Sequence, residues 1–191
     1  MCIRDRYLKY LLGIIGLLVI LFLAKGFITP TISYDSEIVV EKSTKEAWAV
    51  MNDESKISEW LKGIKKVEHV SGEKGTVGAV TQYTFVENDQ ESIILETIKE
   101  IRPEESISMD FVMEGAMSMD YKVEFSEKDG KTHIKSSTIT EGEGMFMRSM
   151  VSFLTGTMKS QEDVNMDNLK KLINENTTNY FPTEVVEMVE E

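Results

Sequence analysis

Six segments in which apolar and polar residues alternate constrain the fold of this 191-residue chain more than any other feature. In such a segment successive side chains point to opposite faces, which is the pattern of a β-strand with one buried face. Glycine, proline, asparagine or aspartate occupies the short connections, as expected for tight turns. The six segments are residues 64–70, 77–86, 92–101, 106–113, 117–125 and 132–140. Strands joined in this way form an antiparallel meander, and its apolar face requires a cover.

The residues on either side of the six segments complete the domain. An alternating stretch at 34–41 predicts one further strand. Ser43 or Thr44 is placed to cap a short helix, and a second short helical piece follows at 55–60. Residues 144–176 contain no proline and repeat apolar side chains every three to four positions, which predicts one long helix. We therefore expect an α+β domain in which about seven antiparallel strands are covered by a C-terminal helix.

A separate apolar run lies near the N-terminus. Every residue from 11 to 24 is apolar or glycine. If Lys9 and Lys25 snorkel, the usable stretch is residues 8–28, roughly 20 residues, which is long enough to cross a bilayer as a helix. The stretch has no polar stripe, so it does not fit a helix of a soluble core. We predict a transmembrane anchor; a signal peptide cleaved near Ala24-Lys25-Gly26 is the alternative.

The charges around this run indicate its direction. Arg4, Arg6 and Lys9 precede it and Lys25 follows it, so the positive-inside rule places the N-terminus in the cytoplasm. We expect a single-pass protein of a bacterial inner membrane, with its domain on the periplasmic or extracellular side. The difference in positive charge between the two ends of the run depends on Arg4 and Arg6. If these two residues are left out, one lysine precedes the run and one follows it, so the orientation stays open.

The rest of the chain is strongly acidic. The whole chain has 21 Lys and Arg against 33 Asp and Glu, and beyond residue 25 the formal charge is −15. An anionic surface repels nucleic acid and anionic lipid headgroups, so we exclude nucleic acid as a partner. The single cysteine, Cys2, excludes a disulfide within the chain. Nothing in the sequence indicates an oligomeric state.

Several stretches occur in the order seen in a known superfamily. They are Ser36-Glu-Ile-Val-Val-Glu-Lys-Ser-Thr-Lys-Glu-Ala-Trp48, the lone Trp60, Gly75-Thr-Val-Gly78, Glu96-Thr-Ile-Lys-Glu-Ile-Arg-Pro103 and Asn168-Leu-Lys-Lys-Leu172. Together they resemble the START-like SRPBCC superfamily, particularly its polyketide cyclase and dehydrase-like members. The resemblance covers about residues 34 to 176.

This resemblance implies a helix-grip fold, in which a curved sheet grips the long helix around a cavity. Such cavities take lipids, sterols, polyketides, quinones or other apolar molecules, and the fold by itself does not imply catalysis. We therefore divide the chain into a leader and anchor (1–28), a linker (29–33), a START-like domain (34–176) and an acidic, loose tail (177–191).

Methionine and aromatic side chains are the candidates for the cavity wall. The chain has 12 methionines, and this flexible, polarizable side chain repacks around ligands of irregular shape. Ordinary core filling is the alternative for each position. Strand alternation and helix spacing predict a ligand-binding set made of Trp60, Tyr83, Phe85, Phe111, Met113, Met117, Met119, Tyr121, Met150, Phe153 and Met158.

A catalytic or metal-binding motif is not found in the sequence. The two histidines, His69 and His133, are isolated, and there is neither a G-x-S-x-G nucleophile elbow nor a phosphate-binding G-x-x-x-x-G-K loop. We expect no metal and no cofactor. The polar candidates for proton transfer in the cavity are Tyr83, Glu96, Tyr121 and Arg148, of which Arg148 has a place at the entrance as its alternative, and the sequence assigns a catalytic role to none of them. The sequence thus favours a binder or carrier of a hydrophobic small molecule or lipid; a cyclase-like enzyme and an interaction module using the tail are the alternatives.

Overall fold

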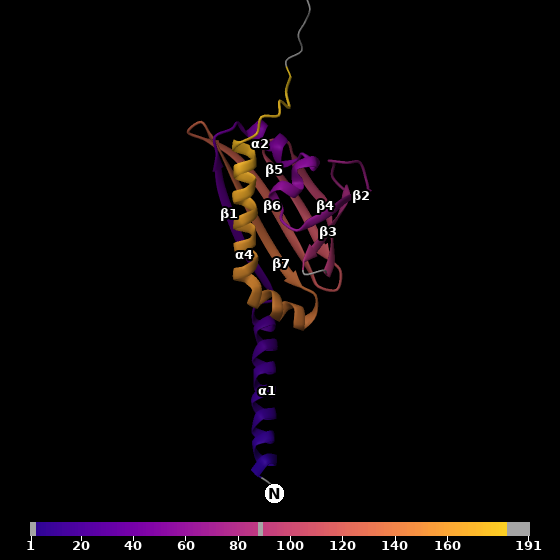
Figure 1. Cartoon of the computed structure of the whole chain (residues 1–191), viewed down its shortest axis with the longest axis vertical. Helices are drawn as coiled ribbons and strands as arrows, with labels where there is room; N and C mark the ends of the chain where they lie inside the picture. Colours follow the sequence, from indigo (N-terminus) through magenta and orange to yellow (C-terminus); the bar gives the residue numbers. More distant parts are fainter. Residues whose placement is uncertain (1–2, 88–89, 183–191) are drawn as a thin grey trace, which may run out of the picture.

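The computed structural model describes residues 3–87 and 90–182. Cys2, the turn expected at residues 88–89 and residues 183–191 of the acidic tail lie outside the described residues. Figure 1 shows a curved sheet with a long helix, α4 (Gly144–Asn174), lying across one face, and a second long helix, α1 (Ile3–Ile28), projecting from one end of the domain. This is the α+β helix-grip arrangement that the sequence predicts.

Seven antiparallel strands form one sheet in the order β1-β7-β6-β5-β4-β3-β2. The last six strands are the meander, and β1 pairs with the final strand, which curls the sheet around α4. The strands are β1 (Thr31–Val40), β2 (Ile64–Ser71), β3 (Val80–Glu87), β4 (Gln90–Arg102), β5 (Ser106–Met113), β6 (Met117–Lys128) and β7 (Lys131–Gly142).

Local sequence signals set the turns and caps. Asp129 and Gly130 both have positive φ, 53° and 72°, in the two-residue connection between β6 and β7. This is the geometry of the type I′ turn that Asp-Gly favours in hairpins. Ser43 caps α2 (Thr44–Met51), where its hydroxyl accepts a hydrogen bond from the backbone N–H of Glu46 at 3.3 Å. The predicted second helical piece is a 3₁₀ turn, η1 (Glu54–Lys56), followed by α3 (Ile57–Trp60).

The first residues of two strands differ from the expected ones by three positions. Strand β1 begins at Thr31, inside the expected linker 29–33, because Ile32 is buried and pairs with Thr140 of β7. Strand β3 begins at Val80 rather than at residue 77, since Val77 lies exposed in the preceding turn. In both cases pairing with a neighbouring strand fixes where the strand begins, and alternation within one segment does not reveal it.

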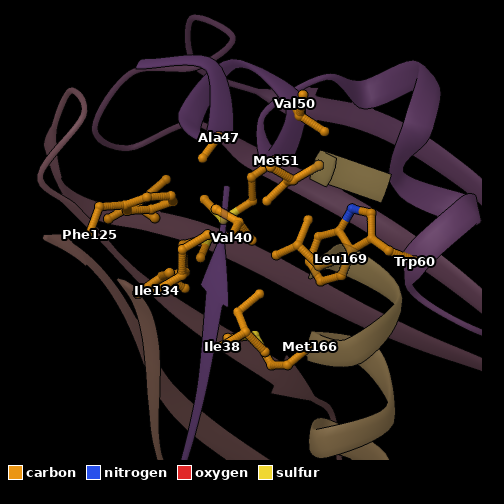
Figure 2. Close-up of a cluster of buried hydrophobic side chains, with 14 of the residues drawn as sticks. Ile38, Val40, Ala47, Val50, Met51, Trp60, Phe125, Ile134, Met166 and Leu169 are labelled. Atoms are coloured by element: carbon orange, nitrogen blue, oxygen red, sulfur yellow. The ribbon is translucent and has the colours of Figure 1, made fainter. Parts of the chain in front are cut away.

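The main hydrophobic core lies between the second half of α4, the sheet and the short helices (Figure 2). From α4 it receives Met166, Leu169 and Ile173, each at most 1% exposed. Figure 2 shows Met166 and Leu169 beside Trp60 at the end of α3 and Ile38 of β1. The residues that complete the buried cluster around them include Val40, Ala47, Val50, Met51, Phe125 and Ile134.

The start of the acidic tail contacts the domain. The Tyr180 hydroxyl donates a hydrogen bond to the Asp53 carboxylate at 2.7 Å, and the Lys45 ammonium lies 4.0 Å from the centre of the Phe181 ring. Asn176, which is buried, accepts a hydrogen bond from the Lys56 ammonium at 2.8 Å. Residues 177–182 therefore follow the surface beside α2 and η1 in the part of the tail that the structure describes.

Helix α1 contains an apolar stretch, Tyr7–Ile28, of 22 residues. By length and composition this stretch can cross a membrane, and a signal sequence has the same properties. Only its last turns contact the domain, where they lie beside the first turns of α4 (Figure 1). The preceding part of α1 projects away from the domain, and its apolar side chains between residues 7 and 21 are exposed.

Candidate ligand-binding cavity

A cavity of about 270 Å³ lies between the inner face of the sheet and α4. For comparison, a dry apolar cavity of about 150 Å³ in another protein binds benzene. Glu162 and Asn165 of α4 face it, and strands β3 to β6 supply 12 of its 26 lining residues. Its apolar lining includes Met51, Ile57, Leu61, Ala79, Ile94, Ile98, Ile107, Met109 and Val123.

Six residues of the predicted ligand-binding set line this cavity. They come from α3, β3, β5 and β6, and alternation within each strand brings them to the same face. They are Trp60, Tyr83, Phe85, Phe111, Met119 and Tyr121. Their role in binding a ligand stays a prediction, but the structure brings these six side chains together around one space.

The other five residues of the predicted set do not line the cavity: Met113, Met117, Met150, Phe153 and Met158. Met113 and Met117 pair with each other at the β5–β6 turn, on the inner face but beyond the end of the cavity. Phe153, on the first half of α4, is 61% exposed and stacks on Phe22 of α1 at 5.4 Å between ring centres. Helical spacing placed Phe153 on an apolar face, yet α1 and not the sheet contacts that face.

An aromatic row crosses the cavity wall. The ring centres of Tyr83 and Phe111 are 6.5 Å apart, and those of Phe111 and Tyr121 are 5.8 Å apart with the rings nearly perpendicular. Both separations lie in the range preferred by aromatic pairs. The row therefore presents aromatic surface from β3 to β6, with a tyrosine at each end.

At one end of the aromatic row, the Glu96 carboxyl group lies beside the Tyr83 phenol. The Tyr83 hydroxyl donates a hydrogen bond to Glu96 at 3.0 Å, and both residues line the cavity. Burial raises the pKa of the Glu96 carboxyl, although the hydrogen bond from Tyr83 acts in the opposite direction. Burial, and then the charge of Glu96, raise the pKa of the Tyr83 phenol. Glu96 thus takes up a proton more readily than an exposed glutamate.

At the other end of the row, α4 supplies a second carboxyl group. Glu162 accepts hydrogen bonds from the Tyr121 hydroxyl at 2.9 Å and from the Ser136 hydroxyl at 2.6 Å. Burial, followed by the charge of Glu162, raises the pKa values of both Tyr121 and Tyr34. The cavity therefore has an acid–phenol pair at each end of its aromatic row.

Sequence reasoning missed Glu162. The sequence did contain a pattern that could have identified it. Glu162 lies four residues after Met158 and four before Met166, which places it on the apolar stripe of the helix. A charged residue within such a stripe is uncommon in a core-facing helix, so it marks a polar site on the buried side.

Polar groups also occur at the cavity rim. The Lys74 ammonium forms an ion pair with Glu54 at 2.9 Å, and both side chains line the cavity. The indole N–H of Trp60 is buried, and within residues 3–87 and 90–182 it has no hydrogen-bond partner. Arg148, the fourth polar candidate from the sequence, lies outside the cavity lining and pairs with Glu141.

Known structures share this architecture. The crystal structure of Ara h 8.0201 matches with a TM-score of 0.61 and 18% identity, covering 76% of this chain and 99% of the other. A protein of Thermus thermophilus matches with a TM-score of 0.61 and 12% identity, covering 74% and 97%. The Zhui aromatase/cyclase from Streptomyces sp. R1128 matches with a TM-score of 0.63 and 9% identity, covering 75% and 93%. At these identities the likeness establishes the fold.

A search of curated proteins gives no significant match. The sequence profile of the Pathogenesis-related protein Bet v 1 family, in contrast, matches residues 30–140, which is more than half of the chain. This match agrees with the START-like resemblance of the sequence and with the helix-grip fold. The chain belongs to the Bet v 1 family.

Proposed function

We propose that this chain is a membrane-tethered binding or carrier protein for an apolar small molecule or lipid. The observation that carries the proposal is the cavity of about 270 Å³, whose wall is mostly apolar in surface and includes the carboxyl groups of Glu96 and Glu162. Ligand sites in proteins have this composition, because the apolar wall supplies affinity and the polar groups fix the orientation of the ligand.

The cavity also indicates the chemistry of its ligand. A flat apolar ring system fits against the row formed by Tyr83, Phe111 and Tyr121. The carboxyl groups of Glu96 and Glu162 accept hydrogen bonds, so hydroxyl or amine groups of the ligand suit both ends of that row. The buried indole N–H of Trp60, which has no hydrogen-bond partner among the residues that the structure describes, offers a donor to a ligand oxygen.

Helix α1 supports the membrane tether. Its 22-residue apolar stretch is about 33 Å long at the rise of an α-helix, which matches the hydrocarbon thickness of a bilayer. The mass of the mature chain purified from membranes tests this part of the proposal. An intact N-terminus supports the anchor, whereas loss of about 25 residues identifies a cleaved signal peptide.

Extraction of the purified full-length protein with organic solvent, followed by mass spectrometry, tests the cavity. We expect the wild type to release an apolar molecule that Met119→Trp does not retain, because the larger side chain fills part of the cavity. Met113→Trp is the matched control, since Met113 shares the inner face of the sheet but does not line the cavity. Equal release from all three proteins, each folded as judged by circular dichroism, argues against the cavity as the binding site.

The Tyr83–Glu96 pair favours a second candidate function, an enzyme that acts on an apolar substrate. A carboxyl group with a raised pKa beside a phenol is suited to proton transfer. The test is to incubate the extracted ligand with the wild type and with Glu96→Gln. Conversion by the wild type alone supports an enzyme, and an unchanged ligand in both samples supports a carrier.

A further inference from the structure

An exposed apolar surface lies where α1 meets α4. It is formed by Phe27 and Ile28 at the end of α1 and by Met145, Phe146, Phe153 and Leu154 of α4, each between 44% and 77% exposed. We name this set the α1–α4 apolar surface. In residues 144–158 the only charged residue is Arg148, which is paired with Glu141, although the chain as a whole has a formal charge of −12. An acidic protein thus has one apolar face without a carboxylate of its own.

Close packing fixes this surface to α1. The Phe22 ring contacts both aromatic rings of α4, with ring centres 5.5 Å from Phe146 and 5.4 Å from Phe153. A Cβ added to Gly26 would come within 2.5 Å of the Ser149 backbone nitrogen, so the two helices approach at backbone distance. The Ser152 hydroxyl donates a hydrogen bond to the Thr29 carbonyl at 3.4 Å. The first half of α4 and the end of α1 are therefore packed closely against each other.

This packing sets the depth of α4 if α1 crosses a bilayer. Phe22 lies six residues before Ile28, the last residue of the apolar stretch. At 1.5 Å per residue, Phe22 is about 9 Å inside the end of that stretch. The rings of Phe146 and Phe153 touch Phe22, so they reach a similar depth. Amphipathic helices that lie in a membrane interface bury their apolar face to about 5–10 Å.

We infer that the α1–α4 apolar surface is inserted into the boundary between headgroups and acyl chains of the bilayer that α1 crosses. The inference rests on the proposed membrane tether and adds a second, interfacial attachment. A flexible tether lets the domain turn freely, whereas two fixed attachments hold it in one orientation. The binding partner of this surface is the lipid bilayer itself, recognised by apolar contact rather than by charge.

Quenching of tryptophan by brominated lipid tests the inference on the full-length protein in phosphatidylcholine vesicles. Phe153→Trp reports on the surface, Ile14→Trp reports on the centre of the apolar stretch, and Phe181→Trp is the control on the opposite side of the domain, beside α2. The native tryptophans, Trp48 and Trp60, give the background emission of the unmodified chain. We expect shallow bromine atoms to remove most of the added emission of Phe153→Trp, and aqueous iodide to remove that of Phe181→Trp.

The outcomes separate the inference from the tether. If Ile14→Trp is quenched by bromine but Phe153→Trp is quenched only by iodide, the surface faces water and the inference is overturned while the tether stands. If Phe153→Trp escapes both quenchers, the surface is covered by protein, such as a second copy of the chain, and the inference is again overturned. If Ile14→Trp escapes bromine, the tether itself fails.

Discussion

The two halves of α4 share one helical repeat but meet different surroundings. Residues 144–158 contain one charged residue and expose Phe146 and Phe153, whereas residues 159–174 contain six charged residues and bury Met166, Leu169 and Ile173. The first half contacts α1 and the end of β7, and the second half contacts the sheet and the short helices around the buried core. Apolar spacing alone therefore does not reveal which partner, protein or lipid, an apolar helix face will meet.

The two halves also differ in their polar groups. In the second half, Glu162 reaches inward to Tyr121 and Ser136, while Asp163 bonds to the Ser36 hydroxyl at 2.8 Å at the edge of the sheet. In the first half, Ser149 bonds back to the carbonyl of Met145 within the helix at 2.9 Å. The second half thus builds the cavity, and the first half builds the contact with α1.

We expect the largest difference between the two halves of α4 in the free energy of unfolding that is lost when one large apolar side chain is removed from each half. Leu169→Ala should lower the free energy of unfolding by about 2–5 kcal/mol, because Leu169 is only 1% exposed and its loss leaves a cavity. Phe153→Ala, the matched change in the first half, removes a mostly exposed ring and should cost less than about 1 kcal/mol in detergent. Urea titrations of the full-length protein, followed by tryptophan emission, measure both values.

Similar losses for the two variants would contradict the comparison. In that case the first half of α4 would be as deeply packed as the second, and Phe153 would belong to the folded core rather than to an exposed surface.

The contact between α1 and the first half of α4 should be sensitive to a single methyl group. Gly26→Ala places a Cβ within 2.5 Å of the Ser149 backbone, and overpacking of this kind costs about 1–3 kcal/mol. We expect faster hydrogen exchange in residues 144–154, measured by mass spectrometry on the full-length protein. Gly16→Ala is the control, because a Cβ there has nothing within 4 Å. Equal exchange in both variants would show that α1 does not support the first half of α4.

Much of the fold could be predicted from the sequence because it depends on local patterns. Alternation placed Tyr83, Phe111 and Tyr121 on the inner face, and Asp129-Gly130 marked the hairpin turn. The positions of Phe153 and of Glu162 could not be predicted in the same way. Both depend on which surface the helix meets, and that is decided by contacts between residues far apart in the chain, from α1 to α4 and from helix to sheet.

In the second half of α4, the Glu162 carboxyl group should affect ligand retention more than the neighbouring Asp163 carboxyl group does. Glu162→Gln keeps the shape but replaces two charge-assisted hydrogen bonds, and it should lower the free energy of unfolding by about 1 kcal/mol and weaken ligand retention. Asp163→Asn is the control, since Asp163 does not line the cavity. Extraction and mass spectrometry of both proteins give the comparison. Loss of ligand from both variants alike would contradict a direct role for Glu162.

The smallest expected effect is on the pH dependence of the free energy of unfolding, and it comes from Glu96 in the cavity that the second half of α4 covers. Burial raises the pKa of Glu96 above its ordinary value of 4.5, so between 4.5 and the raised pKa the folded chain holds more protons than the unfolded chain. The free energy of unfolding therefore falls as pH increases through this window. Glu96→Gln, which cannot ionise, should show a flatter dependence and be more stable relative to the wild type at pH 7 than at pH 4.

Urea titrations at a series of pH values measure this dependence, and Glu91→Gln is the control on the same strand. The Glu91 side chain is 61% exposed, so its replacement should leave the slope of the wild type unchanged. If Glu96→Gln and the wild type show the same slope, water reaches Glu96 freely in the folded protein. Water would then reach the cavity beneath the second half of α4, as it reaches the exposed surface of the first half. The two halves would differ only in the buried core around Leu169.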